Sequence, residues 1–453
     1  MKRRNTVYVL SFDGVPMSGL LVESFKLLSL LQEKGYMIYL DLGYDIKPDK
    51  NNFFKEYTNE AQLIPYGISL ERIRGLEKIE GYNQKFVESV LERIVCKEEN
   101  DTEAFQKINE IAEQIKEKIL ETWKRLNVTF VVVENGTLPE NIIFTQALYK
   151  AIEEYGYSNK FGKYVFWRDH DLMWWSEPGK YGTYPYKNTL KPKKSEYIEY
   201  FVLHDKAKDR ITEWASIDNL HVLPNVYNFS PDEDSNSQNI IRQHYNIGDS
   251  DFVISRTTRI IRAKRIDRDI LLVYRIKEYL KQATIKRKIF LLISGDIEED
   301  SAETIFLQSL IDRLGLRDNV IFIGPLMPIG YAGEGWTVED LLRESDINSF
   351  LTSYDYEGYG NPPGEAISCH IPYLCSRYEI YDDVYGKYGF KGIILETSKE
   401  RDWSIDEKTV YKTIQMLTND KYRASVVDNN YKLGEKILSK NRLPELLAEV
   451  YNI

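Results

Sequence analysis

Two carboxylates, Glu357 and Glu365, stand eight residues apart in the segment YDYEGYGNPPGEAISCHIPYL. Gly358 and Gly360 between them allow the backbone to approach a ligand closely. A helix with Asn361 as its N-cap would begin there and direct backbone N–H groups at an anion. Carboxylates accept hydrogen bonds from sugar or ribose hydroxyls. The segment therefore predicts a site that binds hydroxyls and phosphate together.

A second group of charges lies in the segment RTTRIIRAKRIDRD, where Arg259 and Lys264 stand five residues apart. The segment is an expected strand-to-helix connection. Two cations that converge there can neutralise a diphosphate. The alternative interpretation is a basic loop that faces solvent.

These residues need a scaffold of alternating strands and helices, and the sequence predicts one in each half of the chain. Short apolar runs that end in polar or glycine residues indicate buried parallel strands, and 3.6-residue periodicity indicates helices. In the first half, strands are expected at 8–12, 37–43, 129–134, 164–167 and 200–203, with helices at 20–34 and 101–126. In the second half, strands are expected at 251–258, 288–296, 319–324, 347–353 and 371–376, with helices at 267–281, 303–314, 338–346, from 362 and from 406.

The stretch LPNVYNFSPDEDSNSQN from Leu223 reads as an interdomain linker, because it is rich in Pro, Asn, Ser and Asp. The fold class is therefore α/β, with two doubly wound, Rossmann-like domains facing each other across a cleft. We expect a first domain over 1–224 and a second domain over 225–435. The helix at 436–453 is expected to pack back on the first domain. Residues 50–100 carry no clear pattern.

The two charged segments, in this order and spacing, resemble the retaining GT-B glycosyltransferases of family 4, the group 1 transferases. That family carries Arg-x4-Lys and Glu-x7-Glu motifs, and the counterparts here are RIIRAK and EGYGNPPGE. LPNVYNFSP and ISGD followed by LGLRDNVIFIGPL are similar to other family segments. Two segments depart from the family pattern: Ser18-Gly19 after the first strand, and RYEIYDD after IPYLCS.

The resemblance implies that the domain over 1–224 binds the acceptor and the domain over 225–435 binds the nucleotide sugar. It also implies a role for each matching residue. Arg259 and Lys264 would bind the donor diphosphate, Glu365 the ribose, and Gly19 the phosphate or the acceptor. The remaining donor-site residues would contact the hexose or the base: Glu357, Tyr359, Gly360 and Asn361 for the hexose, and Gly324 and Leu326 for the base. The implied catalytic residues are His170, Arg259, Lys264 and Glu357.

His170 follows the expected strand YVFW, in the segment FWRDHDLMWWSE. A lone histidine is often structural, but a family histidine at this place contacts the donor sugar. ENGTLPEN and HDLMWWSE also resemble a branch of the family that makes mannosylglucosylglycerate or its phosphate. Candidate acceptor residues are Asn135, Asp171, Trp174 and Trp175. The aromatic residues here could stack on a sugar, or they could form a hydrophobic plug with Tyr181, Tyr184 and Tyr186.

Composition narrows the classes of function. The chain has 453 residues and a net charge of -10, which disfavours a nucleic-acid binder. Cys96, Cys369 and Cys375 have neither disulfide-framework nor zinc-site spacing, which favours a reducing cytoplasm. The N-terminal apolar run reads as a strand and not as a signal peptide. No apolar stretch reaches the roughly 18 residues of a membrane span.

The sequence thus predicts a cytoplasmic retaining hexosyltransferase, a monomer or homodimer. It would transfer mannose or, second, glucose from GDP-mannose or UDP-glucose to a small sugar or sugar-acid acceptor. We expect no tightly bound cofactor and no metal site, although a loosely bound divalent metal is compatible with the pattern. Three alternatives stay open: a glycoside hydrolase or phosphorylase using Glu357 and Glu365, a nicotinamide oxidoreductase with Asp41 at the ribose, and a non-catalytic sugar-nucleotide sensor.

Overall fold

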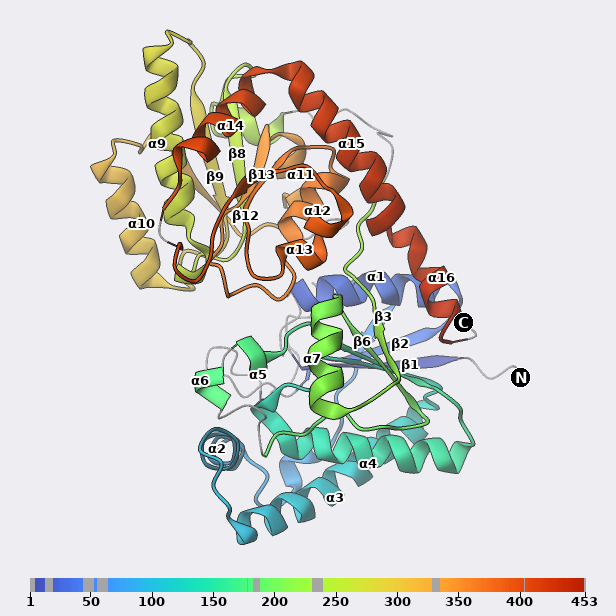
Figure 1. Cartoon of the computed structure of the whole chain (residues 1–453). Helices are drawn as coiled ribbons and strands as arrows, with labels where there is room; N and C mark the ends of the chain where they lie inside the picture. The colour runs from blue at the N-terminus through green and yellow to red at the C-terminus, as the bar shows by residue number, and fades with distance from the viewer. Residues whose placement is uncertain are drawn as a thin grey trace. The chain divides into compact units, whose positions relative to one another are not determined.

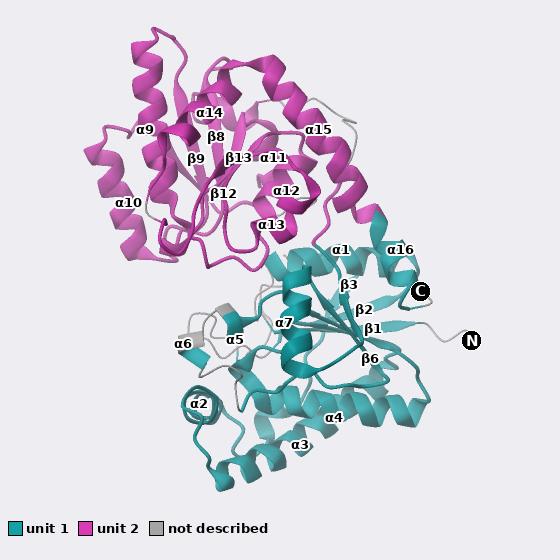
Figure 2. Ribbon diagram, viewed as in Figure 1, with its two compact units in different colours: residues 1–224, 442–453 teal, residues 225–441 magenta. Residues whose placement is uncertain are grey.

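The structure is a computed structural model that describes residues 5–12, 19–43, 53–54, 64–176, 178–181, 188–229, 239–327, 335–402 and 404–451. The chain divides into two compact units (Figure 2). Unit 1 contains residues 1–224 and 442–453, and unit 2 contains residues 225–441.

Unit 1 is built on a parallel sheet of strand order β3-β2-β1-β4-β5-β6-β7. Its central strands are fully buried because helices cover both faces, which explains their continuous apolar runs. The strands are β1 Thr6–Ser11, β2 Met37–Asp41, β3 Ile68–Leu70, β4 Phe130–Glu134, β5 Val165–Asp169, β6 Ile198–Val202 and β7 Leu220–Val222.

In unit 1, α1 lies on one face of the sheet, and α3 and α4 lie side by side on the other face (Figure 1). Asp101 caps α3 by accepting from the Ala104 N–H, and Ile108, Ile111, Ile115 and Ile119 of that helix are buried. The helices are α1 Gly19–Glu33, α2 Gln84–Ser89, the π-helix η3 Val90–Cys96, α3 Thr102–Leu126, α4 Ile142–Asn159, α5 Met173–Ser176, α6 Pro178–Tyr181, α7 Asp205–Ala215 and α16 Leu443–Ala448.

Unit 2 repeats the design with a parallel sheet of order β10-β9-β8-β11-β12-β13. The strands are β8 Phe252–Thr257, β9 Ile289–Ser294, β10 Val320–Gly324, β11 Ile347–Phe350, β12 Tyr373–Ser376 and β13 Ile393–Leu395. One core contains α9, α10 and α14, and a smaller one on alternate strand residues contains α8 and α11. The helices are α8 Ile240–His244, η5 Arg262–Lys264, α9 Ile266–Gln282, α10 Ser301–Arg313, α11 Val338–Arg343, α12 Asn361–Ser368, α13 Tyr381–Val384, α14 Glu407–Thr418 and α15 Asp420–Leu438.

Each sheet reverses its strand order once, between β1 and β4 in unit 1 and between β8 and β11 in unit 2. The loops that leave the carboxyl ends of two such strands run to opposite sides and leave a crevice, where ligands bind in open α/β sheets. The predicted site residues follow these strands or their neighbours. The topology therefore positions the residues considered below.

The α/β fold class is confirmed, and the predicted strands and helices occur within a few residues of the expected bounds, except for the helix expected at 436–453. In its place α15 ends at Leu438 and α16 spans only Leu443–Ala448. Two further features of the sequence prediction need correction. Asn361 is not the N-cap of α12: Gly360 is the cap and Asn361 is the first helical residue. The sequence pattern also missed α4, α7 and the short edge strands β3, β7 and β13. Within the described ranges, no helix is both long and apolar enough to cross a bilayer.

Candidate functional site

Lys264 and Glu357 meet at the strand reversal of unit 2. Lys264 Nζ lies 2.7 Å from Glu357 Oε1, and the side chains are 12% and 9% exposed. The hydroxyl of Thr352 donates to the same carboxylate oxygen over 2.6 Å. The ammonium also lies 5.0 Å from the ring centroid of Tyr356 and 5.5 Å from that of Phe350. The charge is therefore held at a fixed place by a carboxylate and two aromatic rings.

The backbone beneath Lys264 is fixed by residues of the two central strands. Arg256, fully buried in β8, donates from Nη2 to the Lys264 carbonyl. Its Nε lies 3.5 Å from Oδ2 of the buried Asp269. The Ser353 N–H donates to the Ala263 carbonyl over 2.9 Å and joins the loop after β11 to η5. The position of the Lys264 ammonium thus depends on the packed interior of the sheet.

Arg259 lies on the same strand-to-helix connection and is more exposed. Its guanidinium pairs with Glu299, which follows β9, and its side chain is 58% exposed. Gly295, with φ of 123°, lets the end of β9 pack against this connection, because a Cβ there would lie 2.6 Å from the Thr258 carbonyl oxygen. The exposed Arg259 is therefore accessible to a solvent-borne anion, whereas Lys264 is already engaged.

Two buried tyrosines support the loop between Glu357 and α12. Tyr378 donates to the Tyr359 carbonyl over 2.7 Å, and Tyr385 donates to the Gly360 carbonyl over 2.8 Å. Burial raises the pKa of both phenols well above the ordinary value, so they stay neutral donors. Both residues lie after β12, in or just beyond the RYEIYDD segment that departs from the family pattern. The segment that departs from the family pattern thus contributes to holding the loop between Glu357 and α12 in place.

The side chain of Asn361 contacts the start of unit 2. Its Oδ1 accepts from Asn225 Nδ2 over 2.8 Å and from the Tyr227 hydroxyl over 3.1 Å. These contacts take the place of the predicted capping bond, because Asn361 lies inside the helix. Glu365 is half-buried in the second turn of α12.

Three further predicted residues lie at strand or helix ends. Gly324 ends β10 with φ of 81° and Gly19 begins α1, and a Cβ at either position would have no atom of the described residues within 4 Å. Neither backbone is therefore covered by the part of the chain that the structure describes. Leu326 is partly buried and, like Trp336, packs against the small core of unit 2. Ser18 lies outside the described residues.

In unit 1, His170 lies at the carboxyl end of β5, beside the end of β4. Its Nε2 is 2.9 Å from Oε2 of Glu134, which is fully buried. Arg168 binds the same carboxylate through two bonds of 2.9 and 3.0 Å. Burial opposes ionisation of Glu134, but the charge of Arg168 and the contact with His170 prevail and hold its pKa at about 2.

Asn135 connects the ends of β4 and β5. Its Oδ1 accepts from the N–H groups of His170 and Asp171 over 2.6 and 3.2 Å, and its Nδ2 donates to Asp171 Oδ2 over 3.2 Å. Asn135 has φ of 57°, the left-handed region that asparagine tolerates. The structure therefore uses Asn135 to hold His170 and Asp171, and Asp171 is the exposed member of this group.

Asp169 is a buried carboxyl directly before His170. It accepts from the Thr137 N–H over 3.1 Å and is 2% exposed. Burial raises its pKa to about 7; the contact with Thr137 opposes this, and the charge of Glu134 adds to it. Asp169 and Asp171 therefore occupy different surroundings, and their carboxylates do not form a shared pair.

The aromatic residues of the predicted acceptor region divide between surface and core. Trp175 is 38% exposed, and the guanidinium of Arg210 lies over its ring. Tyr181 is fully buried and donates to Glu140 Oε1 over 2.8 Å, so it belongs to the plug of the alternative interpretation. The Trp174 side chain, Tyr184 and Tyr186 lie outside the described residues.

Asp41, which would bind the ribose in the oxidoreductase alternative, is bonded to groups in the interior of unit 1. It is fully buried and accepts from the Tyr8 hydroxyl and from the N–H groups of Gly43 and Ile73, over 3.0 to 3.2 Å. A carboxylate with these three partners is not placed to bind a ribose.

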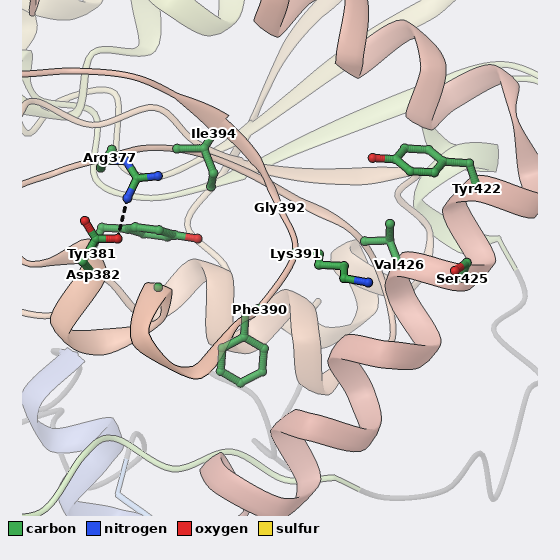
Figure 3. Close-up of a pocket in the computed structure, with 11 residues that line it drawn as sticks. Arg377, Tyr381, Asp382, Phe390, Lys391, Gly392, Ile394, Tyr422, Ser425 and Val426 are labelled. Carbon is green, nitrogen blue, oxygen red and sulfur yellow. Dashed lines mark hydrogen bonds and ion pairs between the residues drawn. The ribbon is translucent and has the colours of Figure 1, made fainter.

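A surface hollow of about 420 Å³ lies in unit 2, near α13, β13 and α15, and Figure 3 shows its lining residues. None of the predicted site residues lines it. Arg377, one of its cations, is paired with Asp382 and Glu396. The hollow is therefore a separate feature from the group at the strand reversal.

Residues 237–433 match the model of the family described as Glycosyl transferases group 1. The match lies within unit 2 and includes Arg259, Lys264, Glu357 and Glu365. The chain thus carries a group 1 glycosyl transferase domain, and it is a glycosyltransferase.

Two relatives have a narrower name. Mannosylglucosylglycerate synthase of Petrotoga mobilis is 24% identical over 323 residues, which cover 67% of this chain and 71% of that protein. The synthase of the same name from Thermotoga maritima is 23% identical over 268 residues, 55% of this chain and 60% of that protein. Among solved structures, Anabaena HepE in complex with UDP-glucose aligns over 99% of both chains with a TM-score of 0.59 and 12% identity. The architecture is that of the GT-B glycosyltransferases.

Sequence patterns did not identify several residues that hold the site together. Thr352 and Arg256 contact residues five and eight positions away, and Tyr378 and Tyr385 contact residues 19 and 25 positions away, at spacings that no motif of the sequence analysis used. Glu134 and Arg168 did leave a signal: each is a charge at the end of an apolar strand, and the two are paired in the β4–β5 register.

The support beneath the loop can be tested at Gly360. Gly360 and Gly389 have φ of 85° and 81°, but a Cβ at Gly360 would lie 2.5 Å from the Tyr378 hydroxyl, whereas one at Gly389 would have no described residue within 4 Å. We expect Gly389→Ala to lower the free energy of unfolding by about 1–2 kcal/mol, the ordinary penalty of this backbone region. Gly360→Ala should lower it by clearly more. Urea unfolding measures both, and equal losses would contradict the proposed crowding.

The pH dependence of stability can be tested at Asp169. Its folded-state pKa of about 7 lies above the unfolded value of about 3.9. The folded protein therefore retains this proton longer, and its stabilising contribution is lost as the pH rises from about 4 to about 7.

Asp169→Asn should remove that loss, so the variant gains stability relative to the native protein between about pH 5 and about pH 8. Urea midpoints at the two pH values measure the gain. Asp218→Asn is the control, because contact with Lys194 lowers the pKa of this exposed carboxylate, which titrates below the window. A pH-independent difference for Asp169→Asn would contradict the raised pKa.

Proposed function

We propose that this glycosyltransferase retains the anomeric configuration and moves a hexose, with mannose favoured and glucose next, from a nucleotide diphosphate sugar to a hydroxyl of a small acceptor. The acceptor is a sugar or sugar acid, such as glucosylglycerate or its phosphate. The names of the two synthase relatives and the matches at ENGTLPEN and HDLMWWSE support this choice. UDP-glucose, the ligand of HepE, is the second donor to test.

The observation that carries the proposal is the contact of Lys264 with Glu357, whose carboxylate also accepts from Thr352, at the strand reversal of the family-matched unit. In this proposal unit 2 binds the donor. Lys264 and Arg259 neutralise the diphosphate, Glu365 binds the ribose, and the backbone at Gly324 and Leu326 lies beside the base. The hexose contacts Glu357 and the backbone of Tyr359, Gly360 and Asn361.

Unit 1 binds the acceptor through the residues around His170, including Asp171, Trp174 and Trp175, with Asn135 holding their backbone. As the glycosidic bond to the leaving phosphate breaks, negative charge grows on the diphosphate. Lys264 and the N-terminus of α12 stabilise that charge. The leaving phosphate accepts the proton of the acceptor hydroxyl on the face where the new bond forms, so no protein nucleophile is needed.

The substrates can be tested by offering GDP-mannose and UDP-glucose to the protein, with GDP and UDP as controls. A donor at 100 times its dissociation constant adds about 2.7 kcal/mol of stability, which raises the unfolding temperature. The donor that does so should then yield a new α-linked product with glucosylglycerate or its phosphate, read by NMR of the anomeric proton. Release of free sugar from a glycoside without any nucleotide would contradict the proposal, as would an inverted product.

The charge role can be tested with Lys264→Ala. Loss of one positioned donor at a developing charge should lower kcat about 100-fold, because the diphosphate leaves less readily. Lys286→Ala removes an exposed lysine of the same unit that has no role in the site, and it should keep native kcat. Thermal unfolding checks that both variants are folded. Near-native turnover of a folded Lys264→Ala variant would rule out the charge role.

A further inference from the structure

His170 is held by a buried pair of charges that the proposed reaction does not itself use. Glu134 is the last residue of β4, Arg168 lies opposite it in the register with β5, and both side chains are almost wholly buried. Arg168 donates one hydrogen bond to each carboxylate oxygen of Glu134, and His170 Nε2 contacts Oε2 of the same carboxylate. We propose that Glu134 and Arg168 are a positioning pair that fixes the tautomer of His170.

The argument starts from the donors and acceptors in this group. Glu134 is ionised across the physiological range, because its pKa is held at about 2, and an ionised carboxylate can only accept. An imidazole nitrogen 2.9 Å from that oxygen must therefore carry a hydrogen. His170 thus keeps its proton on Nε2 when the ring is neutral.

The other ring nitrogen then becomes the reactive face of His170. Nδ1 has no hydrogen-bond partner among the residues that the structure describes. In the neutral ring it is an acceptor, suited to a hydroxyl hydrogen. Its ligand is therefore a hydroxyl of the donor sugar or the acceptor, an assignment that rests on the proposed function. The opposite tautomer would place a lone pair against the Glu134 carboxylate and present a donor instead.

Asn135 completes the arrangement from the backbone side. Its Oδ1 accepts from the His170 N–H over 2.6 Å, so both the main chain and the ring of His170 are fixed by residues at the end of β4. Such second partners orient a functional imidazole and set which nitrogen is available. Glu134 and Arg168 act only through His170 and are not catalytic residues.

The test is a ¹⁵N–¹H NMR measurement of histidine tautomers on the full-length protein without ligand, over about pH 6 to pH 9. The His170 signals are identified by their loss in His170→Gln. We expect the neutral ring to carry its hydrogen on Nε2 in the native protein. An Nδ1–H tautomer would overturn the proposal, and this result needs neither a variant nor an active enzyme.

Glu134→Gln supplies the variant arm. Both oxygens of Glu134 accept hydrogen bonds, whereas a glutamine has one accepting oxygen and one donating NH2 group. The preference of His170 for the Nε2–H tautomer should therefore weaken. The kcat should fall about 10- to 100-fold, as for a small misplacement of a reacting group. Unchanged His170 signals in the folded variant would overturn the proposal. The expected Nε2–H tautomer in the native protein, together with inactivity of that protein toward every nucleotide sugar, would instead contradict the proposed function.

Glu199→Gln is the matched control. Glu199 is another buried strand carboxylate of unit 1 in contact with a histidine, with His221 Nε2 2.5 Å away. This variant should shift the His221 signals and leave those of His170 at native positions. A shift of His170 in this control would mean that the signals report general loosening of unit 1 and would overturn the assignment to Glu134.

Discussion

The contact between Lys264 and Glu357 depends on the reversal of strand order in the sheet of unit 2. The two residues are 93 positions apart in the chain, and they meet because the loops after β8 and β11 leave neighbouring strands at the same edge. The parallel sheet is thus the constraint from which the site follows. The buried Arg256 and the Ser353–Ala263 backbone bond then fix the backbone that carries the Lys264 side chain.

The two units use paired charges at strand ends in different ways. In unit 1, Glu134 and Arg168 are almost fully buried, so breaking the pair would leave an uncompensated charge in a medium of low polarity, which is strongly destabilising. In unit 2, Lys264 is partly accessible and Arg259 is largely exposed. The first arrangement preserves a geometry, and the second keeps Arg259 at the surface, where an arriving anion can contact it.

The sequence predicts the α/β class well because buried parallel strands and amphipathic helices have strong patterns, as α3 illustrates with its periodic isoleucines. Lys264 and Glu357 were each singled out as a member of another pair, by spacing together with the family resemblance, and the structure brings these two together. It failed where the outcome depends on tertiary neighbours. Asn361 has the residue type of a cap, but the side chains of Asn225 and Tyr227 engage it from another segment, and Gly360 takes the capping position.

The edge strands β3, β7 and β13 were missed because they are only three residues long and are defined by their partners. Tyr378 and Tyr385 illustrate the same limit within the site. Their phenols act on the carbonyls of Tyr359 and Gly360, and which carbonyls lie nearby is decided by the packing of α12 and β12. The pairing of Glu134 with Arg168 could have been predicted only if the register between β4 and β5 had been known.

Unit 2 is inserted into unit 1, since the chain returns to unit 1 after Asn441. Tyr227 and Ser439 form a parallel bridge, in which the Tyr227 N–H donates to the Leu438 carbonyl over 2.7 Å and the Lys440 N–H donates to the Tyr227 carbonyl over 2.8 Å. The entry and exit of unit 2 therefore lie one interstrand spacing apart. A segment whose two ends lie side by side can be replaced by a homologous segment without moving the chain of unit 1 at either junction. The two units can therefore be recombined independently during evolution.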